Sequence, residues 1–448
     1  MLLSFPLHIV LSLVLGAILT TAHTVQTISA VGSKFFYENG TQFFMKGIAY
    51  QLTPHDPLID TEQCTRDVTL MSELGVNAIR VYHVDPSADH RGCMDALADA
   101  GIYLFVDLDT FETQIEQGDP HWNETQFARF QAVLDEFQEF PNTAAVFVGN
   151  EVLTTKEGSA AAPYVLAAAR DIKVYRDMKE YRKIPVGYSA ADIAELRPML
   201  QNYFACFEDS YERLDFFALN AYEWCGASSY TISGYNILQK NASGYPIPIF
   251  FSETGCNTVP PRTFEDQTAI FGEEMSDTWS GSIVYEWIEE TNDYGLVSYG
   301  PPTDKGVLTI DLIEDGFTRK GTPTPVSPDF YNLQSQWATL SPTGVALSEY
   351  IKSTDAITLP QCPVPSIGWS VDPNSSLPTL GQTYTPSIPT ETAGKGAPTN
   401  QAPNSKSTSG ISHHDLDSVS VAGIASIDPL VLMSVLLCSL VGFTAFWL

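Results

Sequence analysis

Residues 143–151, Thr-Ala-Ala-Val-Phe-Val-Gly-Asn-Glu, form an apolar run that ends on an amide and a carboxylate. A short apolar run of this kind is typical of a buried strand, so Asn150 and Glu151 would stand at its mouth. Residues 247–257, Ile-Pro-Ile-Phe-Phe-Ser-Glu-Thr-Gly-Cys-Asn, repeat this layout, with Glu253 at the end of their own apolar run. The two strand-end glutamates suggest a carboxylate pair.

A carboxylate pair indicates a specific chemistry. Glycoside hydrolysis needs two carboxyl groups beside the scissile bond, because one protonates the leaving oxygen and the other attacks or stabilises the anomeric carbon. A single strand-end glutamate is more often a capping or ion-paired residue. The Asn150-Glu151 pair together with the matching Ser252-Glu253 pair favours the catalytic interpretation.

Strand and helix patterns alternate along the chain. Strands are predicted at residues 43–50, 76–82, 102–109, 143–151, 184–189, 214–224, 247–253 and 281–287, and helices at 61–74, 90–100, 124–139 and 160–180. This alternation, in a chain of 448 residues, predicts an α/β fold, and a (β/α)8 TIM barrel in preference to an open doubly wound sheet.

Active sites of such barrels lie at the C-terminal ends of the strands. Glu151 ends the fourth predicted strand and Glu253 the seventh, so both carboxyls are expected on one face. Other strands end on that face with Tyr82, Asp107, Asp109, Tyr222 and Tyr285. Aromatic side chains there either stack on sugar rings or fill the mouth of the barrel by packing.

The composition excludes several classes of function. Lys and Arg number 23 against 53 Asp and Glu, and the net charge of −30 would repel phosphate backbones, so no nucleic-acid partner is expected. The sequence has no Gly-x-Gly-x-x-Gly or Walker pattern, and we expect no cofactor. No cysteine or histidine spacing suggests a metal site.

The sequence patterns at the two ends of the chain are typical of targeting segments. Residues 1–22 resemble a secretory signal peptide, and residues 429–448 form an uncharged apolar tail. The tail could span a membrane, but it lacks a basic flank and follows a Ser/Thr/Pro-rich stretch, so a GPI attachment signal is favoured. The predicted organisation is a catalytic domain over residues 23–362, a stalk with the attachment region over 363–428, and a tail that is removed.

Cysteines and sequons agree with a secreted protein. Cys438 lies in the tail, and the other cysteines could form up to three disulfides in a connectivity that spacing alone leaves open: Cys64, Cys93, Cys206, Cys225, Cys256 and Cys362. Asn-x-Ser/Thr sequons, which predict N-glycosylation, begin at Asn39, Asn123, Asn241 and Asn374.

Several separated motifs resemble one known family. They are FMKGIAYQ at 44–51, AIRVY at 78–82, GNE at 149–151, AYEWCG at 221–226, SETGCN at 252–257, YEW at 285–287 and NDYGLV at 292–297. Together they resemble the fungal GPI-anchored β-1,3-glucanosyltransferases of glycoside hydrolase family 72, over about residues 43–362. The similarity is to the subgroup without a C-terminal cysteine-rich glucan-binding module.

The resemblance implies roles for individual residues. Glu151 would be the general acid/base and Glu253 the nucleophile. Glucan contacts are implied at Tyr82, Asn150 and Tyr285, acceptor contacts at Asp192 and Arg197, and further contacts at Gln51 and Tyr222. Asp109 is added from its place at a strand end. The implied disulfides pair Cys64 with Cys93, Cys206 with Cys362, and Cys225 with Cys256.

The resemblance also implies a reaction and a location. The expected activity is elongation of cell-wall β-1,3-glucan by a retaining mechanism, with glucan as donor and acceptor. The expected partner besides glucan is the plasma membrane, reached through the GPI anchor at the extracellular face or in the wall, and the expected state is a monomer. The alternatives are a secreted endo-β-glucanase on the same barrel and a non-catalytic glucan-binding wall protein.

Overall fold

A computed structural model describes residues 25–53, 56–301, 313–314, 316–353 and 358–382. The expected signal peptide at 1–22, the tail at 429–448 and residues 383–428 of the expected stalk lie outside these ranges. No helix within them is long and apolar enough to cross a membrane.

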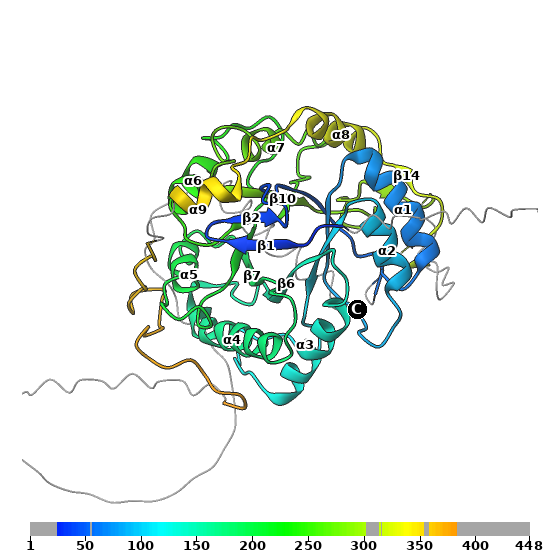
Figure 1. The fold of residues 1–448 in the computed structure, drawn as a ribbon. Helices are drawn as coiled ribbons and strands as arrows, with labels where there is room; N and C mark the ends of the chain where they lie inside the picture. The colour runs from blue at the N-terminus through cyan, green and yellow to red at the C-terminus, as the bar shows by residue number, and fades with distance from the viewer. Residues whose placement is uncertain (1–24, 54–55, 302–312, 315, 354–357, 383–448) are drawn as a thin grey trace, which may run out of the picture. The chain divides into compact units, whose positions relative to one another are not determined.

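A closed barrel of parallel strands forms the centre of the fold (Figure 1). Its strands follow the chain order, and β10 closes the ring onto β3. They are β3 Met45–Ala49, β4 Ala78–Val81, β5 Tyr103–Asp107, β6 Thr143–Asn150, β7 Val186–Ala191, β8 Phe216–Asn220, β9 Ile249–Thr254 and β10 Trp279–Val284. The predicted TIM barrel is confirmed, and each barrel strand lies within or overlaps a predicted strand.

Helices surround the barrel, and their ends follow local sequence signals. Asp60 accepts a hydrogen bond from the Gln63 amide at the start of α1 (Thr61–Leu74), which ends at Gly75 in the left-handed conformation. Asn123 forms a capping box with Gln126 at the start of α3 (Glu124–Phe137). The other predicted helices are α2 (Arg91–Asp99) and α4 (Ala162–Met178), which follows the 3-10 turn η1 (Lys156–Ala161).

Several elements were not predicted from the sequence. The helices are α5 (Arg197–Tyr203), α6 (Tyr235–Ala242), α7 (Asp266–Ile270), α8 (Asp329–Thr339) and α9 (Leu347–Ser353). The strands are β1 (Ile28–Val31), β2 (Lys34–Tyr37), β11 (Val297–Ser298), β12 (Ile313–Glu314), β13 (Phe317–Thr318) and β14 (Thr324–Pro325).

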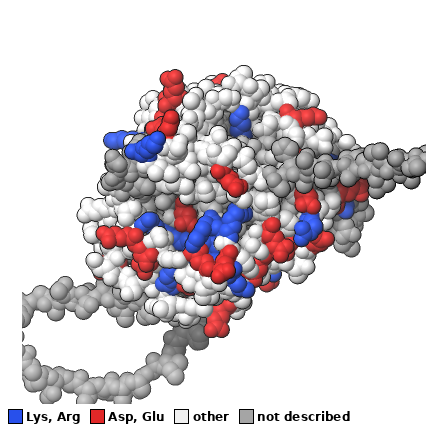
Figure 2. Space-filling model, viewed as in Figure 1, with Lys and Arg blue, Asp and Glu red and all other residues white. Residues whose placement is uncertain are grey.

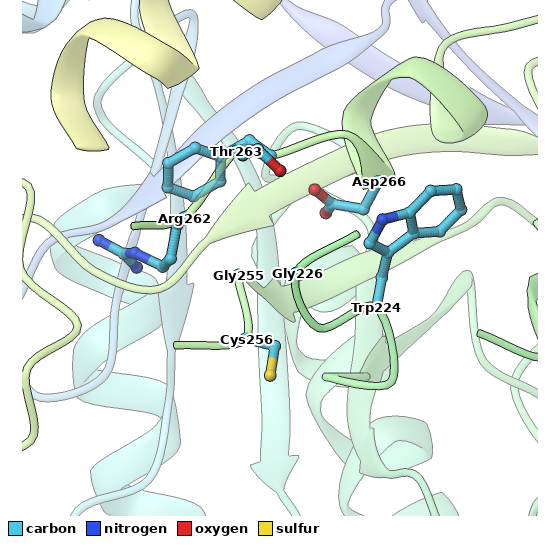
Figure 3. A pocket seen from close by; sticks show the side chains of 8 residues that line it. Trp224, Gly226, Gly255, Cys256, Arg262, Thr263 and Asp266 are labelled. Atoms are coloured by element: carbon cyan, nitrogen blue, oxygen red, sulfur yellow. The ribbon is translucent and has the colours of Figure 1, made fainter. Parts of the chain in front are cut away.

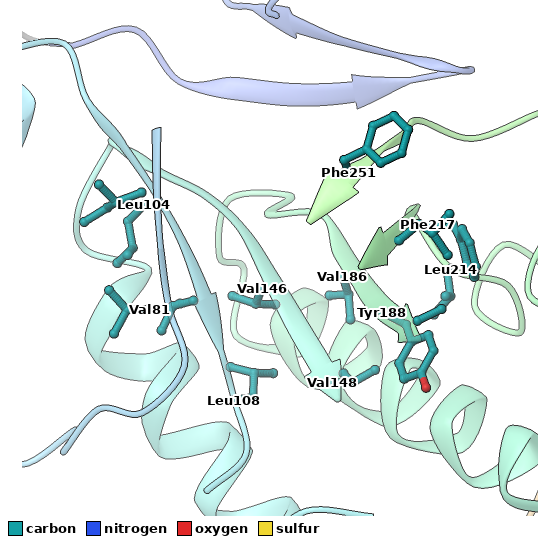
Figure 4. Packing of buried hydrophobic residues seen from close by; sticks show 14 of the residues in the cluster. Val81, Leu104, Leu108, Val146, Val148, Val186, Tyr188, Leu214, Phe217 and Phe251 are labelled. Carbon is teal, nitrogen blue, oxygen red and sulfur yellow. The ribbon is translucent and has the colours of Figure 1, made fainter. Parts of the chain in front are cut away.

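Two hydrophobic clusters follow from the alternation of side chains along the strands. On β6, Val146 and Val148 face the layer between barrel and helices, part of which is drawn in Figure 4, whereas Ala145 and Phe147 face the barrel interior. The hairpin of β1 and β2 crosses one end of the barrel (Figure 1) and adds Phe35 to the interior cluster.

The hairpin closes the N-terminal end of the barrel. The Phe35 ring lies 6.1 Å from the rings of Phe216 and Phe250, and the first residues of β3 and β5 belong to the same cluster. The C-terminal ends of the strands are therefore left to form the site.

Within the described part of the chain, three disulfide bonds form in the pairing that the resemblance implied: Cys64–Cys93, Cys206–Cys362 and Cys225–Cys256. The first joins α1 to α2, and the third joins the segments after β8 and β9. The second ties the segment after α9 to the segment after α5.

The packed structure continues beyond the expected boundary at Cys362. Trp369 is 1% exposed and its ring lies 5.3 Å from the Tyr203 ring, and Leu377 is 5% exposed. The Gly381 amide donates to the Trp122 carbonyl at 2.8 Å. Assigning residues 363–382 to a stalk without a core was therefore wrong, because widely spaced apolar residues pack on the barrel despite the Ser/Pro-rich composition.

Charges of both signs mix on the surface near the hairpin. Figure 2 shows basic side chains gathered near the middle of this side, with acidic ones around them. Among the described residues, Asp177 pairs with both Arg176 and Lys183, and Lys173 pairs with Asp215. The excess of negative charge thus does not produce a surface of one sign on this side.

Candidate active site

Glu151 follows β6 directly, in a backbone conformation that few residues other than glycine adopt. Its φ is +48°, and its amide donates to the Ser189 carbonyl on β7 at 2.8 Å. Such backbone strain is found most often at functional sites. The side chain is half-buried, and the Asn220 amide donates to its Oε1 at 2.9 Å. Burial raises the pKa of Glu151, so its protonated form persists to higher pH than in water.

Glu253 lies near the end of β9 and is surrounded by groups that stabilise a negative charge. The hydroxyl of Tyr82 donates to its Oε1 at 2.9 Å and that of Tyr222 to its Oε2 at 2.7 Å. Arg80 Nη1 lies 3.5 Å from Oε1. Burial raises the pKa of Glu253 to about 7, and Arg80 and the two tyrosines oppose that rise.

The two carboxyls therefore have different surroundings. Glu253 receives two hydroxyl hydrogen bonds and a nearby guanidinium, whereas Glu151 receives one neutral amide. Of the pair, Glu253 is the better suited to be ionised and Glu151 to carry a proton. A protonated acid beside an ionised carboxylate is the arrangement that a retaining glycosidase uses.

Arg80 connects the strand ends beneath the two carboxyls. It is fully buried, and its Nε and Nη2 donate to the two carboxylate oxygens of Asp107 at 3.1 and 2.8 Å. Nη1 donates to Ser189 Oγ at 3.1 Å and Nη2 to Asn150 Oδ1 at 3.0 Å. One side chain on β4 thus contacts groups from β5, β6, β7 and β9.

Asn220, at the end of β8, is held in one orientation. Its Oδ1 accepts hydrogen bonds from Ser189 Oγ at 2.9 Å and Ser252 Oγ at 2.8 Å. Its Nδ2 is therefore directed at Glu151 and at Asn150 Oδ1, which lies 3.1 Å away. The serines fix which atom of the amide faces the acid.

The structure places the other predicted residues around this centre. Gln51 Oε1 accepts from the amides of Tyr82 and His83 at 3.0 and 3.1 Å, so it shapes the backbone that carries Tyr82. Asp109 is 8% exposed, and burial together with the nearby Asp107 raises the pKa of Asp109 to about 8. Its carboxyl is thus protonated at acidic and neutral pH.

Aromatic rings and an ion pair form other parts of the mouth. The ring of Tyr294 packs edge-on against those of Tyr222 and Tyr285, at 5.6 and 5.4 Å. Asp192 and Arg197, which follow β7, form an ion pair with each other. The rings of Tyr222, Tyr285 and Tyr294 thus form one aromatic cluster.

Sequence reasoning missed Arg80 and Asn220 as site residues. Arg80 is a charged residue inside the apolar strand AIRVY, and Asn220 ends the strand FFALN as Asn150 ends its own. A charged residue within an apolar strand and a second strand-end asparagine were therefore the available sequence signals.

Within the described ranges, no group of His, Cys, Asp or Glu side chains is arranged to hold a metal ion.

A small pocket lies beside Cys256, the partner of Cys225 in a disulfide (Figure 3). It is lined by Trp224, Gly226, Gly255, Cys256, Arg262, Thr263, Phe264 and Asp266. Neither Glu151 nor Glu253 belongs to its lining. The chemistry of the site therefore rests on the two carboxyls, and we assign no substrate to this pocket.

The family model and two of the curated relatives that match this chain are described as glucanosyltransferases. The family model described as glucanosyltransferase, of glycoside hydrolase family 72, matches residues 17–312. A 1,3-beta-glucanosyltransferase of Arthroderma benhamiae is 41% identical over 74% of this chain and 59% of its own length. The 1,3-beta-glucanosyltransferase GAS2 of Saccharomyces cerevisiae is 39% identical over 78% of this chain and 62% of its own length. The chain therefore spans about three fifths of the length of these two relatives.

Solved structures are similar to this chain in both fold and sequence. A mutant of Saccharomyces cerevisiae Gas2p in complex with laminaritetraose and laminaripentaose is 38% identical, with a TM-score of 0.70. The similarity covers 79% of this chain and 75% of that one. The residues matched by the family model include both strand ends that carry the carboxyls.

Proposed function

This chain belongs to the glucanosyltransferase family, glycoside hydrolase family 72, and on that premise we propose that it is a retaining 1,3-β-glucanosyltransferase. It would cleave a β-1,3-glucan internally and transfer the new reducing end to the non-reducing end of a second glucan. The observation that carries this proposal is the pair of strand-end glutamates with unlike surroundings, Glu151 beside Asn220 and Glu253 beside Arg80, Tyr82 and Tyr222.

In the first step the Glu253 carboxylate attacks the anomeric carbon. The bond from this carbon to the bridging oxygen breaks, and Glu151 gives its proton to the departing oxygen. The product is a glycosyl ester on Glu253, and the aglycone leaves with a new non-reducing end. As Glu253 loses its charge to the new bond, the hydrogen bonds from Tyr82 and Tyr222 weaken and those hydroxyls become available to the sugar.

In the second step Glu151, now a carboxylate, removes the proton from the 3-hydroxyl of an acceptor glucan. The acceptor oxygen attacks the anomeric carbon, the ester to Glu253 breaks, and the configuration is retained. Asp192 and Arg197 are the residues that we assign to acceptor binding. If water took the place of the acceptor, the same site would be an endo-β-glucanase.

We assign Asn150 and Tyr285 to binding of the glucan near the point of cleavage. Asn150 Oδ1 is held by Arg80 and Asn220, so its amide nitrogen is free to face the sugar 2-hydroxyl, where a hydrogen bond strengthens in the transition state. The proposed location is the outer face of the plasma membrane or the wall, through a GPI anchor, as the terminal segments predict.

The test is to incubate the purified protein with a reduced β-1,3-gluco-oligosaccharide and separate the products by size. Products longer than the substrate are expected, whereas shorter products alone would establish a hydrolase. Glu151→Gln should lower transfer by about 10²–10⁴-fold, and Glu253→Gln should abolish the covalent step. Normal transfer by either variant would contradict the assigned roles.

A further inference from the structure

A groove of about 500 Å³ lies at the N-terminal end of the barrel. Its walls are the β1–β2 hairpin, the second half of α4 and the segments that precede β7, β8 and β9. Glu151 and Glu253 stand at the other ends of their strands, so a ligand in this groove would not reach them. The groove is therefore separate from the proposed active site.

Basic side chains gather in this groove, although the whole chain has a net charge of −30. Among the described residues, the charged side chains of its lining are Lys173, Arg176, Lys183 and Arg213 and the acidic Asp177 and Asp215. Four positive charges against two negative ones leave this lining with a net charge of +2. Figure 2 shows basic side chains gathered near the middle of the side that carries the hairpin. The groove, which we call the basic groove, thus has the sign of charge that attracts an anion.

The two carboxylates of the basic groove hold its cations in place. Asp215 lies 3.4 Å from both Lys173 Nζ and Arg176 Nη1. Asp177 pairs with Arg176 Nε at 2.9 Å and also with Lys183. Each carboxylate is therefore already neutralised by two cations, and the excess positive charge remains available to a ligand.

The two guanidinium groups keep hydrogen-bond donors that the protein does not use. Arg176 bonds through Nε and Nη1 to two carboxylates and one backbone carbonyl, and its Nη2 has no hydrogen-bond partner among the described residues. Arg213 bonds to two backbone carbonyls through Nη1, and within the same ranges its Nε and Nη2 have none. None of these nitrogens is enclosed in the protein interior. Lys173, by contrast, uses all three of its donors and supplies only charge.

We propose that the basic groove binds a phosphate ester, with Arg176, Arg213 and Lys183 contacting the phosphate oxygens. Guanidinium groups match the spacing of phosphate oxygens and can donate to two of them at once. A phosphate has enough oxygens for two guanidiniums and an ammonium, whereas a carboxylate has only two oxygens. This inference does not depend on the proposed glucanosyltransferase function.

The shape and lining of the groove indicate an ester rather than free phosphate. Its volume is in the range of sites for small organic ligands, and Leu214, Pro246 and Ile247 provide apolar surface for an organic body. The net charge of −30 opposes the approach of a long polyanion. A soluble phosphate ester and the head group of a phospholipid present the same chemistry to the groove, so the experiment must distinguish these two sources.

The first experiment titrates the purified protein with glycerol phosphate by calorimetry, with glycerol as the neutral comparison. We expect glycerol phosphate to bind, glycerol not to bind, and added sodium chloride to weaken the binding. Arg213→Gln should raise the Kd about tenfold, because it removes charge-assisted hydrogen bonds, and Lys183→Gln should raise it less. Lys179→Gln is the matched control, since it removes the same charge from an exposed side chain next to α4 that does not line the groove.

The second experiment sediments the protein with phosphatidylcholine vesicles prepared with and without phosphatidic acid, whose head group is a phosphate ester. Binding that requires phosphatidic acid and is weakened by Arg213→Gln would identify a lipid head group as the ligand. Binding of glycerol phosphate without binding of these vesicles would identify a soluble ester. Either result supports the basic groove as the site.

Two results would overturn the inference. One is that neither glycerol phosphate nor the phosphatidic acid vesicles bind. The other is that Lys179→Gln weakens binding as much as Arg213→Gln, because the attraction would then come from the general charge of this surface. If Arg213→Gln lowers the melting temperature, Lys183→Gln decides, since the Lys183 side chain is 71% exposed and its loss should not affect folding.

Discussion

At the scale of single residues, the charge on Glu253 depends on its two tyrosine partners. Burial raises the pKa of Glu253, and its value of about 7 already includes the opposing effect of both hydroxyls, because hydrogen bonds to an ionised group favour that form. The proposed nucleophile must be ionised to attack. The acidic limb of the activity profile should therefore report the ionisation of Glu253.

Replacing Tyr222 with phenylalanine should move the acidic limb upward. Tyr222→Phe removes a donor to the carboxylate, so the pKa of Glu253 rises and the attacking form appears only at higher pH. We expect the acidic limb of kcat/KM to shift by roughly 1 pH unit. Tyr331→Phe, on α8 away from the site, is the control. A shift to lower pH would contradict the assigned direction of the hydrogen bond.

The Arg80–Asp107 pair should carry a large part of the local stability. Both side chains are buried, and removal of one partner of a buried ion pair typically costs about 3–5 kcal/mol because the other charge is left unpaired. Arg80→Met should lower the free energy of unfolding by about that amount, measured by urea denaturation. Adding Asp107→Asn should recover part of the loss. A double variant that loses the sum of the two single losses would show that the two charges are not coupled.

Some residues of the site could be predicted from the sequence and others could not. Glu151 and Glu253 were predicted because each ends an apolar run, and a pattern along one strand is visible in the sequence. Arg80 and Asn220 were not, because their importance lies in contacts with other strands, and such contacts depend on the closure of the barrel. For the same reason, the sequence did not show that Gln51 holds the backbone of Tyr82.

At the scale of elements, His90 joins three segments of the chain. Its Nε2 lies 2.8 Å from Asp56 Oδ2 and its Nδ1 lies 2.8 Å from Glu136 Oε1. Asp56 in turn accepts the amides of Leu58 and Asp85. A carboxylate at each ring nitrogen favours the doubly protonated form of the imidazole, and the side chain connects the loops after β3 and β4 to α3.

Stability should therefore fall as the pH rises. Burial lowers the pKa of His90, but the hydrogen bonds to Asp56 and Glu136 outweigh it, so the folded-state pKa is raised above the usual 6.5. The stabilisation is complete below the unfolded-state pKa and is lost as the pH passes through the folded-state value.

The measurement is the free energy of unfolding at a series of pH values from 6 to 9. His90→Gln should be less stable than the unmodified protein at the acidic end and should lack the decline that begins above the unfolded-state pKa. His121→Gln, at a histidine outside this cluster, is the control. An unchanged slope in His90→Gln would show that other groups produce the dependence.

The elements that sequence predicted are those with a strong local pattern. Helices α1 and α3 have caps and apolar periodicity, and the barrel strands are short apolar runs. Helices α5, α6 and α7 have 7, 8 and 5 residues, which is too short to show a periodic face. Hairpin β1–β2 is stabilised by its place against the barrel interior, which no local pattern reveals.

At the scale of the whole molecule, the barrel was predictable and the extent of the packed unit was not. Alternating strand and helix patterns are sufficient to indicate a TIM barrel. Residues 363–382, however, are rich in Ser and Pro, and Trp369, Val371 and Leu377 do not form a helical or strand pattern. Their burial depends on surfaces that only the folded barrel provides, so composition indicated a stalk.

The same segment gives a test of the packed unit. Trp369 is buried against Tyr203 although it lies beyond the last disulfide cysteine, and replacing a buried tryptophan with alanine typically costs about 3–5 kcal/mol. Trp369→Ala should therefore lower the melting temperature, whereas Ile367→Ala, at a side chain that is 98% exposed, should not. Because Cys206–Cys362 ends before Trp369, the disulfide would remain in both variants. Equal melting temperatures would mean that the packing of residues 363–382 on the barrel does not stabilise it. A chain that ends at Cys362 should then be as stable as one that ends at residue 382.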